Sequence, residues 1–155
     1  MIDLDSIDRR LLAILQEDAT VSIAELAERV GLSQTPCWKR LKRLQDTGVI
    51  TARVALLDRE ALDVSLTVFV AVKTGRHDEA WLETFAKGAS ALPEVVEFYR
   101  MSGEVDYLLK VVVKDIAAYD RFYKRLIATA PLSDVSSSFA MEQIKFTTAL
   151  PIPGA

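Results

Sequence analysis

The stretch Ser33-Gln-Thr-Pro-Cys-Trp-Lys-Arg-Leu-Lys-Arg-Leu44 organises the first part of the chain. On a helical wheel, Cys37, Leu41 and Leu44 fall on one stripe at i, i+4 and i+7, which predicts a short helix that buries this edge. The lysines and arginines of the stretch lie off that stripe. The helix therefore presents a basic surface, which suits the major groove of DNA. The alternative interpretation is an ordinary solvated helix face.

The boundaries of this helix are encoded locally. Ser33 is a favourable N-cap, and Pro36 falls in the first turn, where its missing N–H does little harm. Gly48 then supplies a left-handed stop, so the helix is expected to end near Leu44. We expect its outward side chains to contact DNA. The candidate contacts are Ser33, Gln34, Thr35, Trp38, Lys39, Arg40, Lys42 and Arg43.

Two further helices precede the basic one. Asp5 can cap the first, which is expected to run to about Glu17 with an apolar side. Ser22-Ile-Ala-Glu25 is a capping box that starts the second helix, and Gly31 ends it. Because only Gly31-Leu32-Ser33 joins this helix to the basic one, the two must cross. This is a helix-turn-helix arrangement, and with the first helix it predicts a trihelical DNA-binding domain.

The composition indicates a soluble globular protein. The chain has 155 residues, half of them hydrophobic, which is enough for real cores. No apolar run approaches the roughly 20 residues needed to cross a bilayer, and the acidic start lacks the features of a signal peptide. We therefore expect a cytoplasmic protein with no membrane partner. Cys37 is the only cysteine and His77 the only histidine, so an intramolecular disulfide and an all-Cys/His zinc site are excluded, and no cofactor is expected.

The distribution of charge matters more than its total. The net charge of −3 argues against a protein coated with phosphate-binding cations. Residues 1–30, however, carry three arginines against seven acidic side chains, a net charge of −4. Residues 33–53 carry five cations against Asp46 alone, a net charge of +4. This concentration is expected of a protein that touches DNA with one surface.

The segment after the basic helix links two domains. Val49–Leu57 is rich in β-branched and apolar residues and is expected to be extended, either as a wing or as a linking strand. The polar stretch Asp58–Asp63 is interpreted as the passage to the second domain. The predicted division is therefore residues 1–60, with the linking strand, and residues 61–155.

The second half alternates strands and helices. Strands are expected over residues 65–73, 95–101, 107–113 and 135–147, with helices beginning after Asp78 and Asp115 and a glycine-containing hairpin loop at 102–106. The order βαββαβ predicts a ferredoxin-like domain, an antiparallel four-stranded sheet with both helices on one face. The predicted fold class is thus α+β, an N-terminal winged-helix-like helix-turn-helix domain followed by a ferredoxin-like domain.

One face of that sheet needs a partner. Residues 65–73 are apolar at nearly every position and residues 107–113 nearly so, although the two helices cover only one face. Large exposed apolar patches mark interfaces, and the simplest closed partner is a second copy of the chain. We therefore expect at least a dimer. The alternative is that this face packs on the DNA-binding domain of the same chain.

Several separate motifs, in order and at matching spacing, resemble those of the leucine-responsive regulatory protein/AsnC (Lrp/AsnC) family of prokaryotic transcription regulators over nearly the whole chain. The motifs are Leu4-Asp-Ser-Ile-Asp-Arg-Arg-Leu-Leu12, Ile23-Ala-Glu-Leu-Ala27, Gly31-Leu-Ser33, Cys37-Trp-Lys-Arg-Leu-Lys-Arg-Leu44, Gly48-Val-Ile50 and Gly103-Glu-Val-Asp-Tyr-Leu-Leu109. The resemblance implies a helix-turn-helix domain joined to an amino-acid-binding αβ domain at 61–155. It also implies assembly as dimers and as tetramers or octamers of dimers.

The resemblance also implies an effector site between dimers, at the loop between the second and third strands and the start of the last strand. The candidate effector-binding residues are Ser102, Gly103, Glu104, Val105, Asp106, Ser136, Ser137 and Ser138. Their chemistry suits a zwitterion, since Gly103 permits close backbone approach, Asp106 or Glu104 can hold an ammonium group, and serine hydroxyls can meet a carboxylate. Alternatively, Asp106 only stabilises its own turn, and the serines form an ordinary strand edge.

The sequence thus predicts a DNA-binding transcription regulator whose partners are double-stranded DNA, a small amino-acid effector and further copies of itself. An alternative is a regulator that acts by assembly alone, with no effector. A third interpretation is an enzyme, since Asp106, Tyr107 and His77 are titratable. No nucleophile–base pair, metal-ligand cluster or phosphate loop is evident in the sequence, so we expect no enzymatic activity and no catalytic residue.

Overall fold

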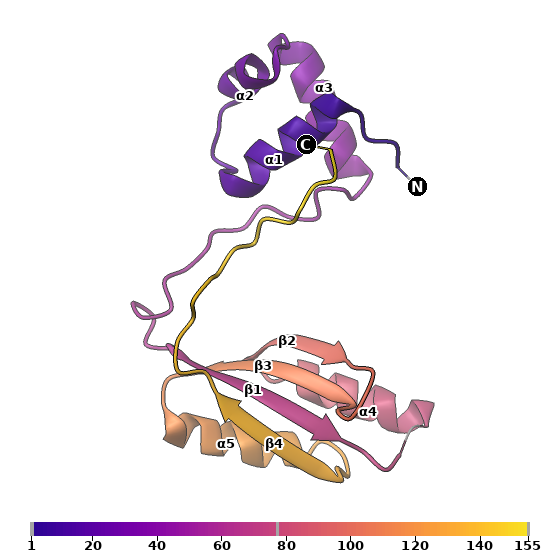
Figure 1. The fold of residues 1–155 in the computed structure, drawn as a ribbon, viewed down its shortest axis with the longest axis vertical. Helices are drawn as coiled ribbons and strands as arrows, with labels where there is room; N and C mark the ends of the chain where they lie inside the picture. The colour runs from indigo at the N-terminus through magenta and orange to yellow at the C-terminus, as the bar shows by residue number, and fades with distance from the viewer. Residues whose placement is uncertain (1, 77, 155) are drawn as a thin grey trace. The chain divides into compact units, whose positions relative to one another are not determined.

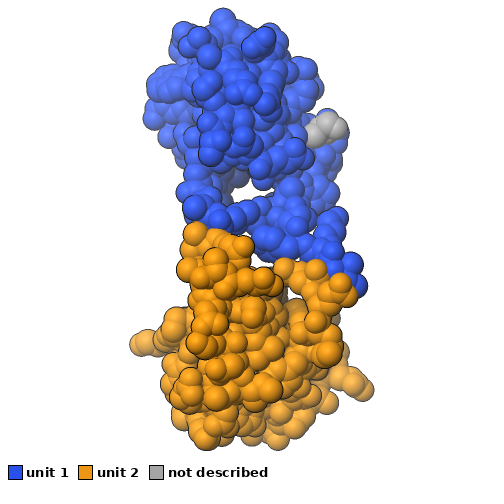
Figure 2. All heavy atoms as spheres, turned by 90° about the vertical axis from the view of Figure 1, so that its left-hand side faces the viewer, with its two compact units in different colours: residues 1–56, 144–155 blue, residues 57–143 orange. Residues whose placement is uncertain are grey.

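The computed structural model describes residues 2–76 and 78–154 (Figure 1). The chain forms two compact units, one of residues 1–56 together with 144–155 and the other of residues 57–143 (Figure 2). This division differs from the predicted one at residues 57–60, which belong to the second unit, and at residues 144–155, which belong to the first. No helix in the described part of the chain is long and apolar enough to cross a bilayer.

The first unit holds three helices, α1 (Ser6–Glu17), α2 (Ile23–Val30) and α3 (Gln34–Asp46). At the start of α1, the Asp8 backbone N–H donates to Asp5 Oδ1 at 2.8 Å, and the Asp5 N–H donates to Asp8 Oδ2 at 3.2 Å. These two bonds make a complete capping box. At the start of α2, Ser22 Oγ accepts from the Glu25 N–H at 3.2 Å, but the Glu25 carboxylate pairs with Arg29. Only half of the predicted second box therefore forms.

The turn between α2 and α3 follows the prediction. Gly31 has a φ of 74°, a left-handed value that glycine adopts without strain, and the Leu32 N–H donates to the Ala27 carbonyl at 2.8 Å. Ser33 is the N-cap of α3, although its side chain makes no capping bond. The helix continues to Asp46, two residues beyond the predicted end. The core of the unit contains Leu11, Leu26, Ala27, Val30, Cys37 and Leu41.

The segment predicted as a wing or a linking strand forms neither. No strand is assigned between α3 and residue 66 among the described residues, and Val54, Leu56 and Leu57 are exposed. A strand needs a neighbour for its backbone hydrogen bonds, and sequence composition does not supply one. The expectation of a strand at residues 49–57 was therefore wrong.

The C-terminal segment of the first unit lies against α1. The Gln16 side-chain amide donates to the Leu150 carbonyl at 3.0 Å, and its oxygen accepts from the Leu150 N–H at 2.8 Å. Further along, the Arg9 guanidinium donates to the Pro153 carbonyl and also to the Leu4 carbonyl of its own helix start. The C-terminal segment is thus anchored through its backbone.

The second unit is a four-stranded antiparallel sheet with two helices. Its elements are β1 (Leu66–Lys73), α4 (Glu79–Ser90), β2 (Val95–Arg100), β3 (Tyr107–Val113), α5 (Ile116–Ile127) and β4 (Asp134–Phe139). The strand order is β2-β3-β1-β4, and both helices lie on one side of the sheet, which confirms the ferredoxin-like prediction (Figure 1). β4 ends at residue 139 and not at 147, and its last pairing is that of Phe139 with Val68 of β1. Met141, just beyond, is 97% exposed.

The two faces of the sheet differ as the apolar strands predicted. Side chains that alternate along β1 and β3 pack with the helices in a core built around Val68, Val70, Val72, Leu109 and Val111, together with Phe85 and Phe122. The intervening side chains point to the other face, where Phe69 is 40% exposed and Ala71 and Leu108 are partly exposed. We call this second surface the open sheet face. It carries Phe69, Ala71, Glu97, Tyr99, Leu108, Lys110, Val112, Ser136 and Ser138.

Candidate functional site

Helix α3 exposes most of the residues predicted to contact DNA. Cys37, Leu41 and Leu44 are buried, as the wheel predicted. The candidates at the helix start and on its outer side are exposed, and Trp38 is 51% exposed. Arg40 is the exception, because its side chain is only 29% exposed. The exposed candidates are Ser33, Gln34, Thr35, Trp38, Lys39, Lys42 and Arg43.

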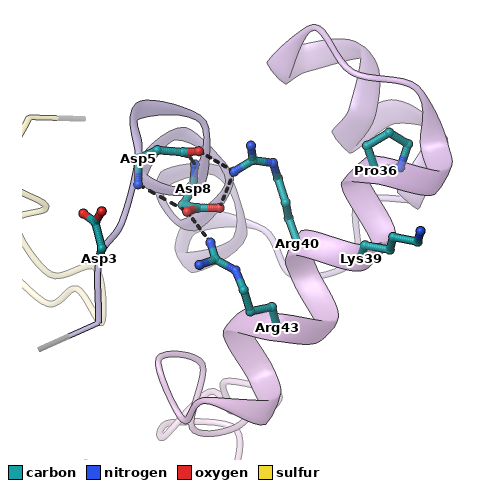
Figure 3. A pocket seen from close by; sticks show the side chains of 7 residues that line it. All are labelled: Asp3, Asp5, Asp8, Pro36, Lys39, Arg40 and Arg43. Carbon is teal, nitrogen blue, oxygen red and sulfur yellow. Dashed lines mark hydrogen bonds and ion pairs between the residues drawn. The ribbon is translucent and has the colours of Figure 1, made fainter.

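Two arginines of α3 point toward the start of α1 (Figure 3). Arg40 Nη1 donates to Asp5 Oδ2 at 2.6 Å and to Asp8 Oδ1 at 3.0 Å, and Arg43 Nη2 donates to Asp8 Oδ2. The Asp8 side chain is 1% exposed, so this carboxylate depends on these partners for compensation. Hydrogen bonds from the Asp8 backbone and then from Arg40 lower the pKa of Asp5. The sequence indicated Asp5 as a cap but did not indicate that Asp5 and Asp8 pair with α3.

These groups line a shallow hollow between the start of α1 and the outer side of α3 (Figure 3). Its volume is about 530 Å³. The residues that line it are Asp3, Asp5, Asp8, Pro36, Lys39, Arg40 and Arg43. Acidic and basic side chains therefore share one surface beside the predicted DNA-reading helix.

The loop predicted to bind an effector is a hairpin tip fixed at its base. The Met101 N–H donates to the Asp106 carbonyl at 2.8 Å, and the Asp106 N–H donates to the Val72 carbonyl at 3.1 Å. Gly103 has a φ of 111°, which favours glycine, and nothing lies within 4 Å of the position that a Cβ would take. The side chains of Ser102 and Glu104 are exposed, and Val105 is partly buried.

Asp106 has a structural bond that sequence reasoning did not identify. Its Oδ2 accepts from the Thr74 backbone N–H at 2.8 Å, just beyond the end of β1. The alternative interpretation was that Asp106 stabilises its own turn, whereas the observed partner, Thr74, lies on a different loop. The carboxylate therefore ties together two loops at one end of the sheet.

The strand register brings the other half of the predicted site to the same end of the sheet. Val72 pairs with Tyr107, which follows the loop, and on its other side with Val135 of β4. The loop and the start of β4 are thus separated by β1 alone.

The three predicted serines do not act as one group. Ser136 lies opposite Ala71 and Ser138 opposite Phe69, so both are on the open sheet face. Successive residues of a strand point to opposite faces, and Ser137 accordingly lies on the helix side. There its hydroxyl is hydrogen-bonded with that of Tyr119, whose pKa is raised by burial. Ser137 is therefore occupied in the core.

The titratable residues considered for catalysis do not form a reaction centre in the described part of the chain. Tyr107 is 4% exposed and packs among the rings of Trp81, Phe85 and Phe98. Asp106 is bonded to Thr74, and His77 lies outside the described residues. The described residues contain no group of three His, Cys, Asp or Glu side chains placed to hold a metal ion.

Protein-family models match segments in both halves of the chain. A winged helix-turn-helix DNA-binding model matches residues 4–51, and the Lrp/AsnC ligand binding domain matches residues 67–150. The chain is 57% identical over 150 residues to the DNA-binding transcriptional activator DecR of Escherichia coli (strain K12), a match that covers 96% of this chain and 99% of DecR.

Two solved structures share the whole architecture. An AsnC family transcriptional regulator from Agrobacterium tumefaciens is 59% identical, with a TM-score of 0.93 over 96% of this chain and 97% of that one. A transcriptional regulator from Neisseria meningitidis, in complex with L-methionine, is 37% identical. Its TM-score is 0.92 over 97% of this chain and 98% of that one.

Proposed function

The chain belongs to the Lrp/AsnC family of DNA-binding transcription regulators, and from this premise we propose that α3 reads DNA and that an amino acid bound beside the loop at 102–106 tunes the binding. The observation that carries the first half is the exposure of Lys39, Lys42 and Trp38 on a helix whose opposite stripe is buried. The proposed place of action is the cytoplasm, because the proposed target is chromosomal DNA.

Self-association is proposed to use the open sheet face. Phe69, Leu108 and Tyr99 lie there, with Lys110 and Glu97 paired at 2.6 Å among them. An apolar face with an internally compensated ion pair suits a second copy of the same face related by a two-fold axis. Such a dimer carries two α3 helices and reads two half-sites.

Residues 57–143 alone are expected to fold and dimerise, because the core of the second unit and the open sheet face both lie within them. Sedimentation of this fragment at micromolar concentration is the measurement. A folded monomer would show that the open sheet face is not the dimer surface.

The effector is proposed to be an amino acid, by analogy with the L-methionine of the Neisseria regulator. The exposed tip at Gly103 lets a ligand approach the backbone, and the exposed Glu104 carboxylate can accept from an ammonium group. Of the two serines on the open sheet face, Ser136 lies nearer this end of the sheet, where its hydroxyl can meet a carboxylate at the margin of the proposed dimer surface. A ligand held there between two dimers shifts assembly by its difference in affinity for the two arrangements.

The test of this proposal is a screen of amino acids by thermal shift, followed by titration of bound DNA with and without each amino acid that raises the melting temperature. Binding to the native state raises stability by mass action, so a true effector gives a shift that grows with its concentration. If no amino acid stabilises the protein, the remaining function is regulation by assembly alone. A genome-wide map of bound DNA identifies the operators.

Changes in the loop are expected to abolish the effector response while sparing basal DNA binding. Gly103→Val forces a β-branched residue into a φ of 111° and blocks backbone approach. Asp106→Ala removes the second carboxylate of the loop that, like Glu104, can accept from the ammonium group, and loss of a charged hydrogen bond costs about 1.5–3 kcal/mol, or more than tenfold in effector affinity. Titration of DNA with each variant, alongside light scattering, measures both properties.

Asp106→Asn is the matched control for the Thr74 contact, because its amide oxygen still accepts from the Thr74 N–H while the charge is lost. A response lost in both variants assigns the effect to charge, and a response lost only in Asp106→Ala assigns it to loop geometry. Wild-type behaviour in all three variants would move the effector site away from this loop.

A further inference from the structure

The pairing of α3 with the start of α1 bears on how DNA is read. We name the group formed by Asp5, Asp8, Arg40 and Arg43 the carboxylate clamp. Its centre is Asp8, whose 1% exposed side chain accepts from both guanidinium groups. Removing one partner of a buried charge is strongly destabilising. Arg40 and Arg43 therefore stay bonded to Asp8, because their departure would leave its buried carboxylate uncompensated.

The clamp divides the four cations of α3 into two classes. Arg40 and Arg43 face two carboxylates, so these charges cancel locally. Lys42 lies 3.3 Å from Asp46, but both side chains are more than half exposed, and such a surface pair contributes little and yields easily to another anion. Lys39 has no ion pair among the residues that the structure describes. The two lysines are therefore the available cations.

We propose that Asp5 and Asp8 are positioning residues that withhold Arg40 and Arg43 from DNA phosphates and fix α3 against α1, leaving Lys39 and Lys42 as the phosphate-binding cations of the helix. This inference rests on the proposed reading of DNA by α3. The proposed effect of the carboxylate clamp is to favour specific over random DNA sequences. Free cations strengthen binding to every sequence alike, whereas a rigidly held helix favours the sequence whose base edges fit.

The salt dependence of binding to a short random-sequence duplex tests the proposal without knowledge of the operator. Each neutralised phosphate contributes about 0.9 to the slope of log K against log salt. Lys42→Gln and Arg43→Gln are a matched pair, since they remove one charge each from adjacent positions. We expect Lys42→Gln to flatten the slope by about 0.9 for each subunit bound, and Arg43→Gln to leave the slope unchanged while lowering the melting temperature.

A second matched pair tests the release of the arginines. Asp8→Asn and Asp3→Asn each remove one negative charge from the lining of the same hollow, but Asp3 takes no part in the clamp. Asp8→Asn is expected to steepen the slope by about 0.9 per subunit as a guanidinium becomes free, and to tighten binding to random DNA. Asp3→Asn is expected to keep the wild-type slope.

Thermal melts show which variants fold. If Asp8→Asn does not fold, the comparison of the salt slopes of Lys42→Gln and Arg43→Gln is the test of the proposal. If Arg43→Gln flattens the slope as much as Lys42→Gln does, the proposal is overturned. A folded Asp8→Asn variant with the wild-type slope also overturns it.

If the wild-type protein binds no duplex at any salt concentration, the DNA-reading role of α3 is contradicted, but the carboxylate clamp is not. In that case the thermal coupling of Asp8→Asn with Arg43→Gln tests the clamp, and additive effects overturn it.

Discussion

The double substitution Phe69→Asp and Leu108→Asp is expected to convert the protein into folded monomers and to weaken its binding to a two-half-site operator by at least about 100-fold. Both side chains lie on the open sheet face and not in the core that the helices cover, so the second unit keeps its fold. Enclosing an unpaired carboxylate in an interface costs several kcal/mol, and about 1.4 kcal/mol corresponds to tenfold in affinity.

Symmetry increases this effect. In an interface between two copies of one face, each substitution appears twice, so the double variant places four carboxylates in one contact. Sedimentation velocity measures the dimer, and DNA titration measures the loss of the second half-site. Ile116→Asp is the matched control, because Ile116 is 70% exposed at the start of α5 and lies off the sheet. A double variant that remains dimeric at micromolar concentration would place the dimer surface elsewhere.

The second large effect is expected from Leu26→Ala in α2. Leu26 is 0% exposed in the small core of the DNA-binding unit. Truncation of a buried leucine costs about 2–5 kcal/mol, and a unit of this size has little stability to lose. We therefore expect the three helices to unfold at physiological temperature and DNA binding to disappear, while the second unit stays folded and dimeric.

Calorimetry distinguishes unfolding of the first unit from unfolding of the whole protein. Only the melting transition of the first unit is expected to shift to lower temperature. Leu56→Ala removes the same atoms from a side chain that is 63% exposed, and it is expected to change stability by less than about 0.5 kcal/mol. If Leu26→Ala binds DNA with wild-type affinity at 37 °C, the three-helix core is more tolerant than its packing indicates.

Features that depend on local periodicity and capping were predictable from the sequence. The buried stripe of α3, the left-handed glycine before it and the antiparallel order of the four strands were confirmed. In each case the signal lies within a few residues, because side-chain spacing and turn chemistry act over that range.

Features that depend on a distant partner were not predictable. β4 stops at Phe139, which pairs with Val68 of β1, and no periodicity within β4 records that limit. Ser137 was grouped with its neighbours, and strand alternation could have separated it from them, but its partner Tyr119 lies on α5 and could not be read from the strand. The local sequence around Asp8 does not reveal its partners, because only the packing of α3 against the start of α1 brings Arg40 and Arg43 to its carboxylate.

The C-terminal segment that lies against α1 has a consequence for the order of events during synthesis. The three helices form their core from residues near the N-terminus, and such a core can fold as soon as it leaves the ribosome. Leu150, however, is made 134 positions after the Gln16 to which it bonds. The sheet unit between them is translated in the interval, so the DNA-binding unit is the first to begin folding and the last to be finished.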